Sequence, residues 1–217
     1  MIEKSLTSTF THYAALGDSL TEGIWDWGQG DRRAGFAHLL HTALQTRFPE
    51  LRFSKLGVSG ARVADVVRGQ LDRAIALRPD FVTVLIGAND VPLTPTPQFA
   101  RDYTHVIERL RRESGATIVA ATLPNVAALL PVTYEIMRLP LAARLDEFNR
   151  VIARVAAAHE VPVVDLFGSE VGIAPGNSSR DGLHPNPQGY RLLADGFVQL
   201  LNAQFALDLP SPLATRS

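Results

Sequence analysis

The chain has 217 residues, 46% of them hydrophobic and 20% charged, which is enough to fill the core of one globular domain. A formal net charge of -1, with acids and bases interspersed, provides no basic surface for nucleic acid, and the lack of cysteine excludes disulfides, thiol nucleophiles and thiolate metal sites. The first residues contain no apolar stretch typical of a secretory signal, and no run is long enough to cross a bilayer. We therefore expect a cytoplasmic protein without a membrane span.

Apolar segments of strand length alternate along the chain with amphipathic segments of helix length. The predicted strands are residues 13–16, 52–56, 81–86, 117–121 and 161–164, and the predicted helices are residues 34–47, 63–77, 98–113, 141–159 and 187–202. Several strands are apolar at consecutive positions, as expected of parallel strands covered on both faces. The order therefore predicts an α/β fold with an open, mostly parallel sheet between two layers of helices.

No internal repeat, low-complexity segment or linker divides the chain, so we expect a single domain over residues 1–206. Residues 207–217 contain two prolines among small polar residues, and this composition favours a loosely ordered tail.

Four short segments carry the side chains and backbone groups that a hydrolytic site needs. They are Gly17-Asp18-Ser19-Leu20, Gly57-Val58-Ser59-Gly60, Gly87-Ala88-Asn89-Asp90 and Asp181-Gly182-Leu183-His184. The first three follow the first three predicted strands, and ligands of open α/β sheets bind outside the carboxyl ends of the strands. The sequence therefore predicts that these segments meet at one edge of the sheet.

Ser19 offers a hydroxyl nucleophile among small residues that permit a tight turn. The alternative for this serine is a helix cap, because Glu22 three residues later completes the pattern of a capping box. His184 is the candidate general base, since imidazole exchanges protons near neutral pH. Asp181, three residues earlier, is the candidate carboxylate that orients the ring and stabilises its charged form.

Gly60 and Asn89 are candidates for stabilising an oxyanion. A glycine lets its backbone N–H face a ligand, and an asparagine side chain is a neutral donor. Taken singly, both have an ordinary alternative as turn residues. The sequence contains no zincin motif and no phosphate-binding glycine loop, so neither a metal nor a nucleotide is indicated.

These segments together resemble the motifs of the SGNH hydrolases, also called the GDSL esterase/lipase family. The resemblance implies a flavodoxin-like α/β/α sandwich of three layers with five parallel strands, and ester hydrolysis through an acyl-enzyme without a cofactor. It assigns attack to Ser19, base and acid catalysis to His184, and orientation of that ring to Asp181. It assigns the oxyanion hole to Asn89 and to the backbone amides of Gly60 and Ser19. The chain departs from the family at Lys55, where many members have asparagine.

The expected partner is a small ester with a short or medium acyl group, or an acetyl group, and a carbohydrate O-acetyl ester is the alternative substrate. Trp25, Trp27 and Leu123 are the candidate substrate-binding residues. Residues 122–140 are apolar enough either to complete the core or to form an acyl pocket or lid. A binding module without catalysis is the alternative of another class, because a fold alone does not fix a function. The oligomeric state is left open.

Overall fold

The protein folds around a five-stranded sheet, described here from a computed structural model that covers residues 9–129, 135–169 and 175–214. The strands are β1 (His12–Gly17), β2 (Arg52–Lys55), β3 (Phe81–Leu85), β4 (Thr117–Ala121) and β5 (Val163–Val164). They lie in the order β2-β1-β3-β4-β5, and every neighbouring pair is parallel. This is the flavodoxin-like order, so the predicted fold class is confirmed.

The two central strands explain why the sheet forms where the sequence predicts it. All residues of β1 and β3 are buried, so their consecutive apolar side chains are covered on both faces. Tyr13 of β1 is fully buried, and its hydroxyl forms a hydrogen bond with the hydroxyl of Thr83 of β3 at 2.8 Å. Gly17 pairs with Leu85, so β1 and β3 end side by side.

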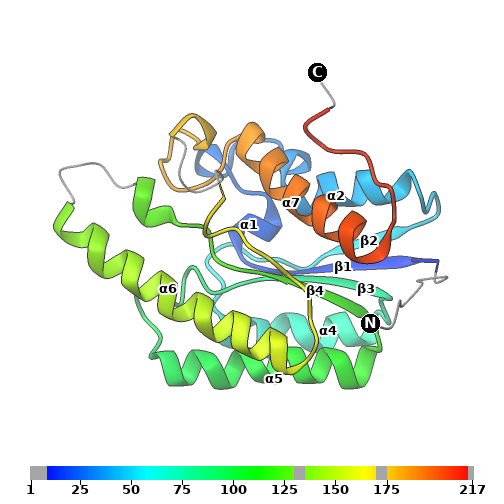
Figure 1. Cartoon of the computed structure of the whole chain (residues 1–217), viewed down its shortest axis with the longest axis horizontal. Coiled ribbons are helices and arrows are strands. Elements are labelled where there is room, and N and C mark those ends of the chain that lie inside the picture. The colour runs from blue at the N-terminus through cyan, green and yellow to red at the C-terminus, as the bar shows by residue number, and fades with distance from the viewer. Residues whose placement is uncertain (1–8, 130–134, 170–174, 215–217) are drawn as a thin grey trace.

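Helices cover both faces of the sheet (Figure 1). One layer contains α2 (Phe36–Gln45) and α7 (Pro187–Phe205), which contact each other. The other contains α4 (Leu71–Ala76), α5 (Thr96–Ser114) and α6 (Glu135–Ala158). The short helices α1 (Ser19–Glu22) and α3 (Val63–Asp65) follow β1 and the loop after β2. The result is the predicted sandwich of three layers.

The predicted helix at residues 63–77 is not regular. Between α3 and α4 the chain forms a π-helix from Val66 to Gln70. Gln70 is 3% exposed, and its side chain donates to the carbonyl of Gly17 at 2.8 Å and accepts from its N–H at 2.9 Å. The π-helix thus places the buried side-chain amide of Gln70 against the end of β1. Such π-helical turns are often found beside functional sites.

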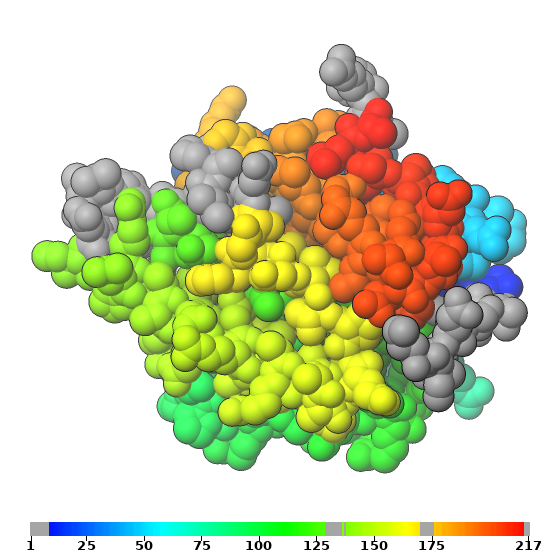
Figure 2. All heavy atoms as spheres, in the orientation of Figure 1, coloured from blue at the N-terminus to red at the C-terminus, as the bar shows by residue number. Residues whose placement is uncertain are grey.

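The C-terminal segment differs from the loosely ordered tail that its composition favours. Leu207 and Leu209 are each 5% exposed, and the Asn202 side chain bonds both the N–H and the carbonyl of Leu209. Figure 2 shows the red C-terminal residues packed against the orange residues of α7. Residues 207–214 are therefore anchored, because the two leucines bury apolar surface. The average composition of this segment does not reveal their effect, since most of the surrounding residues are small or polar.

Candidate active site

The candidate site lies at the carboxyl ends of β1 and β3, where the strand order reverses direction. At this point the chain leaves β1 toward one face of the sheet and leaves β3 toward the other face. The two connections leave a crevice between them in which ligands bind. Ser19 lies two residues after the end of β1, and Asn89 lies four residues after the end of β3. The predicted common edge is therefore present for these two segments.

A tight turn places Ser19 at the start of α1. A Cβ atom on Gly17 would lie 2.1 Å from the carbonyl oxygen of Leu85, so only glycine fits there. Asp18, and not Ser19, caps the helix, since its side chain accepts from the N–H of Leu20 at 3.0 Å. The capping-box alternative for Ser19 is thus wrong, and its hydroxyl is free for another partner.

That partner is His184, which links Ser19 to Asp181. The distance from Ser19 Oγ to His184 Nε2 is 2.9 Å, and the distance from His184 Nδ1 to Asp181 Oδ2 is 2.8 Å. An ionised carboxylate can only accept, so Nδ1 carries the ring hydrogen and the neutral ring accepts the Ser19 hydroxyl proton at Nε2. This tautomer suits a base that withdraws a proton from the serine.

Hydrogen bonds keep Asp181 ionised. Burial alone raises the pKa of this carboxyl, but the backbone amides of His184 and Leu183 and the side chains of His184 and Ser179 outweigh burial, so the pKa lies well below its usual range. Oδ1 accepts from the Ser179 hydroxyl at 2.7 Å and from the two backbone amides at 2.9 Å each. The carboxylate is therefore fixed in both charge and direction.

The three proposed oxyanion donors lie on the turns that follow β1, β2 and β3. Within the described residues, the backbone N–H groups of Ser19 and Gly60 have no hydrogen-bond acceptor. For Ser19 this is normal, because the first N–H groups of a helix have no partner within the helix. Gly60 adopts a φ of +78°, which favours glycine. Asn89 Nδ2 donates one hydrogen to the carbonyl of Ala61 at 3.0 Å, which leaves its second hydrogen for a ligand.

Two buried carboxyl groups lie behind these turns. Asp90 is fully buried; it accepts from the N–H of Val63 at 2.8 Å and from the Thr94 hydroxyl at 2.8 Å, and burial raises its pKa. Asp18 is 1% exposed, and its Oδ2 has no hydrogen-bond partner among the described residues. Burial raises the pKa of Asp18 to about 7. Sequence patterns did not single out either acid, since both look like ordinary turn residues.

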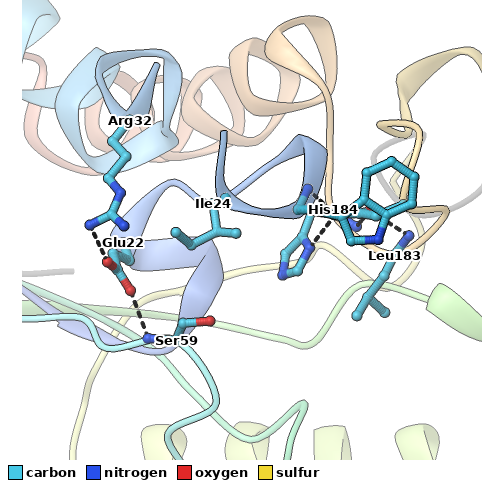
Figure 3. A pocket seen from close by; sticks show the side chains of 9 residues that line it. Glu22, Ile24, Arg32, Ser59, Leu183 and His184 are labelled. Carbon is cyan, nitrogen blue, oxygen red and sulfur yellow. Dashed lines mark hydrogen bonds and ion pairs between the residues drawn. The ribbon is translucent and has the colours of Figure 1, made fainter. Parts of the chain in front are cut away.

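An open cavity of about 480 Å³ adjoins His184 (Figure 3). Trp27 lines this cavity and is 70% exposed, with a backbone φ of +55° that is unusual for a bulky residue. Leu183, 58% exposed, lines it as well. The remaining lining residues are Glu22, Ile24, Gly28, Arg32, Ser59 and Asp181.

Two of the predicted substrate-binding residues have other positions. The Trp25 ring packs over Gly30 and against the core, and its Nε1–H donates to the carbonyl of Asp31 at 3.2 Å. Leu123 is 1% exposed and packs beneath Gly87. Neither lines the cavity, and nor does any described residue from 122 to 140; residues 130–134 of that stretch lie outside the described residues.

No group of three His, Asp or Glu side chains in the described parts of the chain is placed to hold a metal ion. None of the described helices is both long and apolar enough to span a membrane.

A serine bonded to a histidine, which is bonded in turn to an ionised aspartate, at the carboxyl edge of a flavodoxin-like sheet, defines the class of the α/β serine hydrolases. Comparison with known proteins gives the particular family. Residues 15–192 match the GDSL-like Lipase/Acylhydrolase family, and the chain belongs to it. The resemblance stated from the motifs is therefore confirmed, and the protein is an ester hydrolase rather than a binding module without catalysis.

Known relatives agree with this membership. An acetylxylan esterase of Geobacillus stearothermophilus is 27% identical over 199 residues, which cover 85% of this chain and 90% of that enzyme. A crystal structure of an acetylxylan esterase from the same organism has a TM-score of 0.72 at 21% identity, covering 89% of this chain and 95% of its own. Further structures of that esterase are described as catalytic mutants, with alanine at a serine, an aspartate or a histidine.

A crystal structure of an alpha/beta hydrolase enzyme from the metagenome of Lake Arreo, Spain, has a TM-score of 0.73 at 23% identity. The match covers 92% of this chain and 99% of that one. Likeness at this level of identity supports the fold.

Proposed function

We propose that the protein hydrolyses carboxylic esters of short acyl groups through an acyl-enzyme on Ser19. His184 Nε2 takes the hydroxyl proton as Ser19 Oγ attacks the ester carbonyl, and Asp181 stabilises the imidazolium that forms. The tetrahedral oxyanion is held by the amides of Ser19 and Gly60 and by Asn89 Nδ2. His184 then gives its proton to the leaving alcohol, and the acyl-enzyme is cleaved by a water activated in the same way.

The observation that carries this proposal is the hydrogen-bonded chain from Ser19 through His184 to Asp181, with its two distances of 2.9 and 2.8 Å. An organophosphate label followed by peptide mapping tests it. We expect a single modified peptide containing Ser19, and Ser19→Ala is expected to lose about 10⁶-fold in turnover, as other serine hydrolases do. Label on another residue, or activity that survives Ser19→Ala, refutes the proposal.

Within the esters, we favour O-acetyl groups on carbohydrates. The cavity beside His184 combines an exposed aromatic face, Trp27, with the charged side chains of Glu22 and Arg32, and sugars present both apolar faces and hydroxyl groups. A long acyl chain would need an apolar channel, which these charged residues do not provide. The acetylxylan esterase relative supports the same substrate class.

Release of acetate from acetylated xylooligosaccharides, compared with hydrolysis of p-nitrophenyl esters of two to twelve carbons, separates the two substrate classes. We expect kcat/KM to be higher for the acetylated sugars than for p-nitrophenyl acetate and to fall as the acyl chain lengthens. A rise in kcat/KM from acetate to octanoate, with no activity on the sugar, assigns the enzyme to acyl esters of longer chain instead.

A further inference from the structure

Glu22 connects the helix that begins at Ser19 with the loop that carries Gly60. It is the last residue of α1, and its side chain is 16% exposed. Its Oε2 accepts a hydrogen bond from the N–H of Ser59 at 2.7 Å. Since Ser59 directly precedes Gly60, this bond holds the loop one residue away from a proposed oxyanion donor. Figure 3 shows Glu22 between Arg32 and Ser59, on the wall of the cavity that contains His184.

Two cations hold Glu22 in place. The Arg32 guanidinium pairs with Oε1 at 2.5 Å, which leaves Oε2 for Ser59. Lys55 Nζ donates to the main-chain carbonyl of Glu22 at 2.7 Å. A cation at the carbonyl end of a helix is favourable, so Lys55 supports the end of α1.

Gly60 depends on such support from its neighbours. Apart from its chain neighbours, no atom lies within 4 Å of the position that a Cβ on Gly60 would occupy, so this side of the residue is open. The residue that follows is held, because Ala61 is 5% exposed and its carbonyl accepts from Asn89 Nδ2 at 3.0 Å. The start of the loop is fixed by close contact, because a Cβ on Gly57 would lie 2.7 Å from the Thr21 side chain and 2.9 Å from the N–H nitrogen of Glu22. The bond from Ser59 to Glu22 continues this contact to the residue before Gly60.

We infer that Glu22 is a positioning residue for the oxyanion hole, which it aligns by holding the loop of Gly60 against the helix of Ser19. The inference rests on the proposed function, because it assumes that the Gly60 amide binds the oxyanion. Donors stabilise a transition state only when they are fixed at its position beforehand, and a displacement of about 1 Å can cost roughly 100-fold in rate. An ionised acceptor suits the task, since bonds to charged groups are shorter and stronger than neutral ones.

Three variants test the role of Glu22 on p-nitrophenyl acetate. Glu22→Ala is expected to lower kcat by about 10- to 100-fold, with KM within about 3-fold of the parent. Glu22→Gln is expected to recover most of kcat, because its amide oxygen still accepts the Ser59 N–H. Glu113→Ala is the matched control: Glu113 also pairs with arginines, on α5, and its loss is expected to leave kcat unchanged.

Affinity for a trifluoromethyl ketone distinguishes positioning from general support, because its hemiketal oxyanion occupies the oxyanion hole. We expect Glu22→Ala to weaken the binding of this inhibitor by the same factor by which it lowers kcat. In the double variant with Asn89→Ala, the loss of inhibitor binding free energy is expected to be smaller than the sum of the two single losses. Should the alanine variant fail to fold, Glu22→Asp, whose shorter side chain cannot reach Ser59, is expected to give the same two losses.

Either of two results overturns the role of Glu22: a parental kcat in a folded Glu22→Ala or Glu22→Asp variant, or a lower kcat with unchanged inhibitor affinity. The proposed function fails separately, by survival of activity in Ser19→Ala. An inactive Ser19→Ala together with a fully active Glu22→Ala therefore removes only the inference drawn from Glu22.

Discussion

The two sides of the candidate active site are built differently. The inner wall, formed by residues 17–22, 57–63 and 87–90, is held by buried side chains, because Gln70 bonds both backbone groups of Gly17 and Asp90 accepts from the N–H of Val63. The outer wall, formed by residues 26–31 and 177–184, is held by turns at the surface and presents Trp27 and Leu183 to solvent. The inner wall thus supplies fixed backbone amides, whereas the outer wall supplies exposed side chains.

The proposed triad crosses between these two walls. Ser19 belongs to the inner wall, while His184 and Asp181 belong to the outer wall, so the 2.9 Å contact between serine and histidine depends on how the walls are joined. The fully buried Tyr190 contributes to that joint: its hydroxyl donates to the carbonyl of Ile24 at 2.6 Å, which ties the loop after α1 to the helix after His184.

After Ser19→Ala, the largest expected effect comes from removing the negative charge of Asp181, which belongs to the outer wall. Asp181→Asn is expected to lower kcat on p-nitrophenyl acetate by about 10⁴-fold, because the amide can donate to the ring and turn it to the tautomer that cannot accept from Ser19. Asp80→Asn is a suitable control, since Asp80 accepts backbone amides at the opposite edge of the sheet. A loss of less than 10-fold would leave Asp181 as a turn residue only.

Local sequence patterns were sufficient for most of the fold. Strands buried on both faces are apolar at consecutive positions, and all five predicted strands are present within a few residues of their predicted bounds. The π-helix is not predicted, because its Gln70 bonds Gly17 over 53 residues of sequence, a contact that local patterns do not encode. A polar Gln70 on the apolar face of the predicted helix was the one local sign of that contact.

For the site, motifs predicted which residues meet but not how they are supported. Ser19, His184 and Asp181 are joined as their motifs indicated, although their roles stay predictions. Glu22 entered the sequence interpretation only as a capping partner, because its bond to Ser59 depends on how two loops pack.

The next expected effect comes from Trp27 of the outer wall, for which Trp25, two residues earlier and packed against the core, is the comparison. Trp27→Ala is expected to raise KM for an acetylated xylooligosaccharide by about 3- to 10-fold, the loss of one aromatic contact, with p-nitrophenyl acetate little affected. Trp25→Ala is expected to lower the free energy of unfolding by about 2 kcal/mol through lost packing, without changing the preference between the two substrates. Equal KM values for Trp27→Ala and the parent on the sugar would remove the stacking role.

The smallest effect on rate is expected at Asp18, on the inner wall beside the nucleophile. In Asp18→Asn the amide oxygen can still accept from the N–H of Leu20, so the cap of α1 persists and kcat should stay within about 3-fold of the parent. The stability of the fold should nevertheless change, because the substitution removes a buried group that ionises near pH 7.

The direction of that change follows from where Asp18 ionises in each state. The unfolded chain releases the proton near the ordinary pKa of 3.8, whereas burial keeps it on the folded protein until about 7, so this carboxyl makes the folded state less stable as the pH rises between those values. The negative charge of Asp90 raises the pKa of Asp18 further. At 1.36 kcal/mol per pH unit the interval corresponds to an upper limit of roughly 4 kcal/mol. Urea unfolding should therefore show Asp18→Asn more stable than the parent at pH 8 and equal to it below pH 4; an equal gain at both would mean that packing, and not charge, sets the stability at this position.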